Sequence, residues 1–234
     1  MRTGAETTGN ITQSSTGYIQ LASGTTAQRP ASPVNGMARY NTDLVAFEGY
    51  QNGSWVLLTD IGLQTIWVPA AAMKPQRINS CTNLVTTDLG LTYPNLSSLN
   101  FDPTTQQYAQ FSIAMPKSWN LGTITYQVIW TNPTATTNYG VVWSLAGVSV
   151  GDSQATATAF GTAVTITDTG TNTANTLQVS PVSSALTIGN TPAASELVYF
   201  QFSRVASNAS DTLATSAYLL GVSIFFTTNA STDN

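Results

Sequence analysis

The sequence predicts an all-β protein: an N-terminal arm and a small β-meander, followed by an antiparallel, jelly-roll-like β-sandwich. Apolar and polar residues alternate with a period of two along several segments after residue 63, as in half-buried strands. Turn residues separate these segments, and the β-branched threonines suit a pleated surface. We expect an extended arm and linker over 1–36, a meander over 37–62 and the sandwich over 63–234.

The first 36 residues carry few apolar side chains. Residues 1–23 are small and polar, so we expect an arm that becomes ordered only on a partner. The following stretch, SGTTAQRPASPVNG (23–36), holds two prolines and two glycines, which favour an extended, turn-rich connection.

The meander is predicted from short strands and tight turns. We expect strands over 37–40 and 45–50, and Asn52-Gly53 predicts a type I′ hairpin turn that places Tyr50 opposite Trp55. About twenty residues bury too little apolar surface to be stable alone. The missing apolar partner is expected from the C-terminal domain or from other copies of the chain.

The sandwich is predicted from nine alternating segments, with one short helix over 151–161 between a cap-like Asp152 or Ser153 and Gly161. The longer candidate strands are 108–116, 122–132, 139–150, 196–204 and 217–228. The shorter ones are 64–68, 164–168, 177–179 and 185–188.

Composition excludes several classes of function. The chain has 7 Lys+Arg against 11 Asp+Glu, and these basic residues are scattered, so we expect no nucleic-acid binding. There is no histidine, which removes Ser-His-Asp and Cys-His catalysis, and the lone Cys81 is interpreted as a small buried hydrophobe. No apolar segment is long enough to span a membrane, no secretory signal is evident, and no metal or cofactor is expected.

Carboxylates are too few for a convincing hydrolase. Glycoside hydrolysis usually needs two carboxylates about 5–9.5 Å apart, and no paired motif is present. We therefore expect no enzymatic activity and interpret the acidic residues as solvated loop carboxylates. The candidates considered are Asp88, Asp102, Asp168, Glu196 and Asp211.

Glycan binding needs aromatic platforms beside polar groups. Trp119, Tyr139, Asn138 and Tyr93 are the candidates, because they lie outside the predicted strand cores or at their ends. The alternative for Trp119 is that it closes one end of the sandwich or packs at a subunit interface.

The segment SGTTAQRPASPVNGMARYNTDLVAFEGYQNGSWV (23–56) resembles a block of tailed-bacteriophage virion proteins, especially tail fibres and other appendages. The residues that carry the resemblance are Arg29-Pro30, Pro33, Asn35-Gly36, Arg39-Tyr40-Asn41-Thr42, Phe47-Glu48-Gly49-Tyr50, Asn52-Gly53 and Trp55. The stretches FDPTTQQYAQFSIAMPKSWNLGTITYQVIWT and NYGVVWSLAGVSVGD are similar to a β-sandwich module of small phage structural proteins.

This resemblance implies a virion protein, assembled in the host cytoplasm and not secreted: a short homotrimeric tail fibre that contributes to host attachment. The meander would be a neck closed by two symmetry mates, with an interface of Arg39, Tyr40, Phe47, Glu48, Tyr50 and Trp55. Arg39 and Glu48 would form an intersubunit ion pair; the alternative is an ordinary surface pair. The arm would dock on other virion proteins of the baseplate or capsid, and the sandwich would face a host glycan.

Three other functions stay open at this point. A capsid decoration or head-appendage protein is the alternative within the same class. A carbohydrate-binding module outside any virion is the competitor from another class, and a glycan-cleaving spike is the third.

Overall fold

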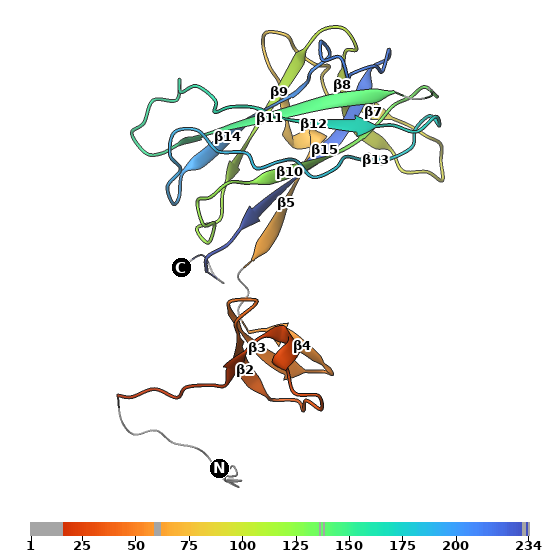
Figure 1. The fold of residues 1–234 in the computed structure, drawn as a ribbon. Coiled ribbons are helices and arrows are strands. Elements are labelled where there is room, and N and C mark those ends of the chain that lie inside the picture. Colours follow the sequence, from red (N-terminus) through yellow and green to blue (C-terminus); the bar gives the residue numbers. More distant parts are fainter. Residues whose placement is uncertain (1–15, 59–61, 136, 138, 231–232, 234) are drawn as a thin grey trace. The chain divides into compact units, whose positions relative to one another are not determined.

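The computed structural model describes residues 16–58, 62–135, 137, 139–230 and 233. The chain divides into two compact units, unit 1 (Met1–Asp60) and unit 2 (Ile61–Asn234), and each is treated by itself. The secondary structure is almost entirely β, which confirms the predicted fold class (Figure 1). No helix in the described residues is long and apolar enough to cross a bilayer.

Unit 1 holds a four-stranded sheet in the order β1-β2-β3-β4. Its elements are β1 (Ser23–Gly24), the 3-10 helix η1 (Thr26–Gln28), β2 (Ala38–Asn41), β3 (Ala46–Gln51) and β4 (Ser54–Leu57). The predicted hairpin is confirmed: Tyr50 is paired with Trp55, and their ring centroids lie 5.4 Å apart. Asn52 and Gly53 have φ values of 50° and 79°, the two left-handed residues of a type I′ turn.

Part of the segment expected to be an extended arm belongs to this sheet. Strand β1 pairs in parallel with β2, and the Tyr40 amide donates to the Ala22 carbonyl at 2.9 Å. The meander therefore finds main-chain hydrogen-bond partners in the residues just before it, within the same chain. The source of its missing apolar partner, expected from the C-terminal domain or from other copies, stays a prediction.

Unit 2 is a sandwich of two sheets (Figure 1). The six-stranded sheet has the order β13-β10-β15-β8-β7, with β5 also paired to β15, and the five-stranded sheet has the order β12-β11-β14-β9-β6. The strands of the first sheet are β5 (Leu63–Pro69), β7 (Val85–Thr87), β8 (Leu96–Phe101), β10 (Thr125–Thr131), β13 (Gln178–Val179) and β15 (Ala217–Thr227). Those of the second are β6 (Lys74–Pro75), β9 (Gln107–Ala114), β11 (Gly140–Val150), β12 (Val164–Thr169) and β14 (Leu197–Arg204).

The core lies between these sheets, and its residues are those that the alternation places on one face of each strand. Trp143 of β11 is fully buried, stacks on Phe202 at 5.3 Å and meets Phe101 and Trp130 edge-on at 5.6 and 5.9 Å. The sheets are thus joined by a dense aromatic cluster, and their other faces point away from it.

Two expected elements are absent. Residues 151–161 form turns and bends instead of a helix, because the Gln154 side chain accepts from the Gly151 amide and Gly161 donates its amide to Gly147 of β11. The β-branched Thr156 and Thr158 also lower the helix propensity. Residues 185–188 make one isolated bridge, between Leu186 and Ile124, and no strand. The only helices in the described residues are η1 and η2 (Ala70–Ala72).

Candidate functional site

Two aromatic residues predicted to bind a glycan are buried. Trp119 is 2% exposed and bridges to Thr228, and Tyr139 is 2% exposed and donates its hydroxyl to Asn132 Oδ1 at 2.6 Å. Neither ring can stack on a sugar, so the prediction of these two as binding platforms was wrong. The physical reason is that each ring fills the sandwich interior; Tyr139 packs against Trp130. The alternative of Trp119 in the sandwich interior agrees with this burial.

For the other two candidates, Tyr93 and Asn138, glycan binding stays a prediction. Tyr93 is 66% exposed and lies over Gly90, where an added Cβ would come within 3.2 Å of its ring. Asn138 lies outside the described residues.

The five carboxylates considered for catalysis are all engaged in structural hydrogen bonds. Asp168 accepts from Trp130 Nε1 at 2.8 Å, and Asp211 forms a buried ion pair with Arg204 at 2.7 Å. Glu196 accepts from Ser149 and from the Ala193 amide.

The remaining two carboxylates terminate turns. Asp88 accepts the Gly90 amide, and Asp102 accepts both the amide and the hydroxyl of Thr104. These bonds from Thr104 keep the pKa of Asp102 below its usual value, as the bond from Ser149 does for the pKa of Glu196. A depressed pKa favours the ionised form, so at neutral pH such a carboxyl holds no proton to donate as a general acid.

In unit 1, the predicted interface pair Arg39 and Glu48 is internal. Glu48 is 0% exposed, and its carboxylate contacts Arg29 at 2.6 Å, Asn41 at 3.0 Å and Arg39 at 3.5 Å, all from the same chain. The bond from Arg29 is the main cause of a lowered Glu48 pKa. The prediction of an intersubunit ion pair between Arg39 and Glu48 was wrong, and so was the alternative of an ordinary surface pair. Buried within one chain, neither residue can form the predicted interface.

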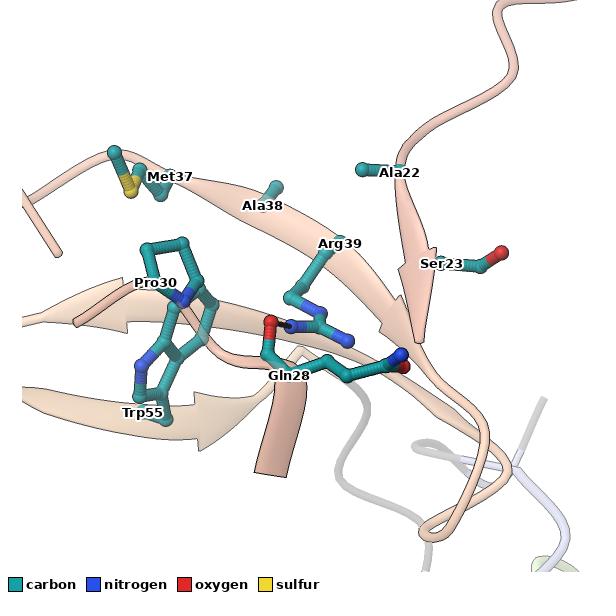
Figure 2. A pocket seen from close by; sticks show the side chains of 8 residues that line it. All are labelled: Ala22, Ser23, Gln28, Pro30, Met37, Ala38, Arg39 and Trp55. Carbon is teal, nitrogen blue, oxygen red and sulfur yellow. Dashed lines mark hydrogen bonds between the residues drawn. The ribbon is translucent and has the colours of Figure 1, made fainter. Parts of the chain in front are cut away.

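An open pocket of about 470 Å³ lies beside this network (Figure 2). Trp55, Pro30 and Met37 form its apolar wall, and the Arg39 guanidinium lies behind it, donating to the Gln28 and Thr25 carbonyls at 2.8 and 3.1 Å. These bonds direct Arg39 toward the main chain rather than toward a ligand. The pocket is therefore a weaker candidate for a binding site than the sandwich surface.

The other predicted interface residues are only partly buried. Phe47 is 45% exposed and meets Tyr40 edge-on at 5.3 Å. Tyr50 and Trp55 are half-buried, and the Arg29 guanidinium lies 5.7 Å from the centre of the Trp55 ring. An interface at these four residues stays a prediction.

The strongest candidate in unit 2 is an open groove of about 520 Å³ on the five-stranded sheet. It is lined by Ala72, Lys74, Pro75, Gln76, Arg77, Gln110, Phe111, Ser112 and Tyr199. Strand alternation places Gln110 and Ser112 of β9 and Tyr199 of β14 on the outer face, because Phe111 and Phe200 between them stack in the core at 4.9 Å.

Two glutamines that line the groove, Gln76 and Gln110, belong to a hydrogen-bonded cluster that also includes Gln201. Gln76 Oε1 accepts from Gln201 Nε2 at 2.8 Å and from Gln110 Nε2 at 3.3 Å. Gln110 and Gln201 are cross-strand partners, and Gln76 follows β6. These bonds orient the three amides and leave the Gln76 NH₂ group and two amide oxygens for a ligand. We call this set the glutamine cluster.

Charge in the groove is of one sign. Lys74 and Arg77 are both exposed, and among the described residues no Asp or Glu lines the groove. Lys74 is also the cross-strand partner of Gln110, so its ammonium-bearing chain begins next to the glutamine cluster.

An exposed tryptophan that was not among the predicted site residues lies on the other sheet. Trp67 of β5 is 47% exposed, and its ring lies against Gly221 of β15, where an added Cβ would be 2.3 Å from the ring. Its cross-strand neighbour is Ser223. The signal in the sequence was Gly221 within the apolar strand, since an isolated glycine in a strand indicates a close approach.

The groove was harder to predict from the sequence than the exposed Trp67. Gln110 and Tyr199 occupy polar positions of alternating strands, which in sequence mark only the face turned away from the core. Gln76 and Arg77 belong to a stretch without alternation. Their convergence depends on β6 pairing with β9, which sequence patterns do not reveal.

Comparison of the sequence with protein-family models and with curated proteins finds no match. Among solved structures, the chain is similar to a family 11 carbohydrate-binding module from Clostridium thermocellum, in complex with a β-1,3-1,4-mixed-linked tetrasaccharide. The identity is 8% and the TM-score 0.37, over 74% of this chain and 99% of that one. It is also similar to TmCBM61, in complex with β-1,4-galactotriose, at 10% identity and a TM-score of 0.30, over 70% and 88% of the two chains. These sugars are ligands of those two modules.

Proposed function

We propose that this chain is a non-catalytic glycan-binding protein and that its binding surface is the groove on the five-stranded sheet. The observation that carries the proposal is the glutamine cluster, whose three amides are held in place by bonds of 2.8 and 3.3 Å. Sugar hydroxyls both donate and accept hydrogen bonds, and planar amides do the same. A preoriented set loses little conformational entropy when a sugar binds.

Tyr199 adds an aromatic edge to this polar floor. It is half-buried on the outer face of β14, next to Ser112 across the strand pair. An aromatic ring can cover the apolar face of a sugar, and the tyrosine hydroxyl can hydrogen-bond to polar groups at the edge of the groove. The groove thus combines the two features that glycan recognition requires.

Binding without catalysis is supported by the carboxylates. No acidic residue of the described chain lines the groove, and the five carboxylates considered for catalysis are hydrogen-bonded to turns, to Trp130, to Ser149 or to Arg204. A sugar in the groove would meet no pair of carboxylates at hydrolytic spacing.

The test is a glycan-array screen followed by calorimetric titration of the best ligand. Gln110→Ala combined with Gln201→Ala should weaken binding about tenfold or more, because hydrogen bonds of about 0.5–1.5 kcal/mol each are lost. Tyr199→Ala should weaken it by a similar factor. The matched controls are Gln64→Ala and Tyr218→Ala, which change the same residue types on the six-stranded sheet. Equal losses in the controls, or no ligand on the array, would refute the proposal.

We further propose that this glycan-binding sandwich belongs to a virion appendage, a short trimeric tail fibre, with a capsid decoration protein as the alternative. The favouring observation is that Arg29, Arg39, Asn41 and Glu48, all within the resembling block, form the polar interior of unit 1. The block is thus a folding unit, as a reused neck module would be.

Light scattering tests the assembly. A homotrimer should have about three times the chain mass of 24.7 kDa. Removal of residues 1–21 keeps β1 and should leave the trimer intact while it abolishes incorporation into particles. A monodisperse monomer would contradict the neck, and a truncated chain that still enters particles would contradict docking through the arm.

A further inference from the structure

We infer that the groove on the five-stranded sheet binds a negatively charged saccharide, one whose rings carry carboxylate or sulfate groups. The inference rests on the proposed function and names the class of its ligand. It is carried by the positions of Lys74 and Arg77, which line the groove beside the glutamine cluster.

Most other cations of the described chain are already used. Arg29 and Arg39 contact Glu48, and Arg204 contacts Asp211 through two nitrogens at 2.7 and 3.0 Å. These three guanidinium groups stabilise the fold, and turning any of them to a ligand would remove an ion pair from a buried carboxylate.

Lys74 and Arg77 differ from these arginines because they form no ion pair among the described residues. Lys117 is the other exposed lysine, but Asp233 accompanies it; the pKa of Asp233 is lowered mainly by hydrogen bonds from Ser118 and in smaller part by Lys117. The chain as a whole carries a formal net charge of −4. Two uncompensated positive charges in one groove are therefore a local exception on an acidic protein.

The local field favours an anion. A carboxylate that approached the rest of this acidic surface would be repelled, whereas in the groove it would meet an ammonium and a guanidinium with no competing acid. Arg77 can hold a carboxylate or sulfate with two parallel hydrogen bonds, and Lys74 acts as a point charge. The amides and Tyr199 would contact the sugar hydroxyls.

Two cations suit a short acidic sugar better than a nucleic acid. Duplex-binding proteins commonly make about 6–10 phosphate contacts, and the groove supplies two positive groups. Its neutral lining of Ser112, Tyr199, Gln76 and Gln110 matches sugar hydroxyls.

The test compares charged saccharides with an uncharged ester of equal length. An oligogalacturonide, its fully methyl-esterified form and a sulfated oligosaccharide of equal length are titrated into the full chain by calorimetry. The acidic sugars should bind about tenfold tighter than the ester, and this advantage should fall as salt rises from about 0.05 M to about 0.5 M.

Charge-removing variants locate the effect. Lys74→Gln and Arg77→Gln together should remove the preference, so that the acidic sugars and the ester bind with equal affinity, whereas Lys117→Gln, the matched control, should leave the preference intact. Equal affinity for the charged and esterified sugars would overturn the inference while the proposed function stands. A preference that survives the double variant would overturn it as well. No binding of any of these sugars, nor of any neutral array glycan, would overturn the proposed function itself.

Discussion

The two units of this chain have interiors of different chemical character. In unit 1 the most buried groups are charged or polar: Glu48 and Asn41 are fully buried, and Arg39 nearly so. In unit 2 the buried groups are mainly aromatic and aliphatic, centred on Trp143 and Phe202. The same β-architecture is thus stabilised in one case by hydrogen bonds to a carboxylate and in the other by apolar packing.

Size explains this difference. A small sheet buries a small fraction of its surface, so apolar burial alone supplies little stability. Unit 1 compensates with long arginine side chains that reach back to Glu48 and to main-chain carbonyls before β2. The consequence is that unit 1 should be sensitive to charge and pH, and unit 2 to cavities.

The largest expected effect tests the aromatic interior of unit 2. Trp143→Ala should destabilise unit 2 by about 3–5 kcal/mol, because it leaves a cavity between the sheets. Chemical denaturation followed by circular dichroism would measure this loss. Trp143→Phe, which keeps a ring and removes a buried indole N–H without a partner, should cost less. Equal costs for the two variants would show that the ring is not the source of stability.

The second prediction tests the charged interior of unit 1 through pH. The folded pKa of Glu48 lies below its usual value near 4.5. A carboxyl with a depressed folded pKa stabilises the fold above its unfolded pKa and loses that contribution as the pH falls through the folded value. We therefore expect the NMR signals of unit 1 to lose dispersion below about pH 4.5 before those of unit 2.

A charge-neutral variant should reproduce this effect at pH 7. Glu48→Gln keeps the shape of the side chain but leaves Arg29 and Arg39 without their counter-ion, so unit 1 should lose its cooperative transition. Asp43→Asn is the matched control, since the exposed Asp43 side chain accepts one bond, from the Thr26 amide, that an amide oxygen can also accept. Retained dispersion in Glu48→Gln would contradict a charge-stabilised interior.

The sequence predicted local structure better than long-range contacts. The Asn52-Gly53 turn and the pairing of Tyr50 with Trp55 follow from the conformation of two residues and were correct. The long strands were correct as well, because alternation reports directly which face is buried.

Errors came from contacts between distant segments. Arg29 reaches Glu48 across nineteen positions, and nothing in the local pattern assigns Glu48 to the interior. Trp119 and Tyr139 lie between or at the ends of predicted strands, and only the packed sandwich shows that their rings turn inward. The groove also depends on contacts between distant segments, since β6 and β14 must both pair with β9 to form it.

The third prediction sharpens the comparison within unit 2 and concerns the outer face of its six-stranded sheet. Gly221→Ala should displace the Trp67 ring, since the new Cβ would lie 2.3 Å from it and 2.6 Å from the Val68 carbonyl. We expect a cost of about 1–3 kcal/mol and a changed tryptophan fluorescence. Glycan binding in the groove should persist, because the groove lies on the other sheet. Unchanged fluorescence would show that Trp67 does not lie against Gly221 in solution.

The smallest expected effect concerns Cys81, a reporter of whether unit 2 stays closed. Its side chain is buried, and burial raises the pKa of its thiol to about 12. Because the thiolate is the reactive form, an aromatic disulfide reagent should label native Cys81 very slowly at pH 8. Labelling should become fast in denaturant or in Trp143→Ala, which opens unit 2, and should stay slow in Glu48→Gln, which disturbs unit 1. Fast labelling of the Glu48 variant would show that the two units do not unfold independently.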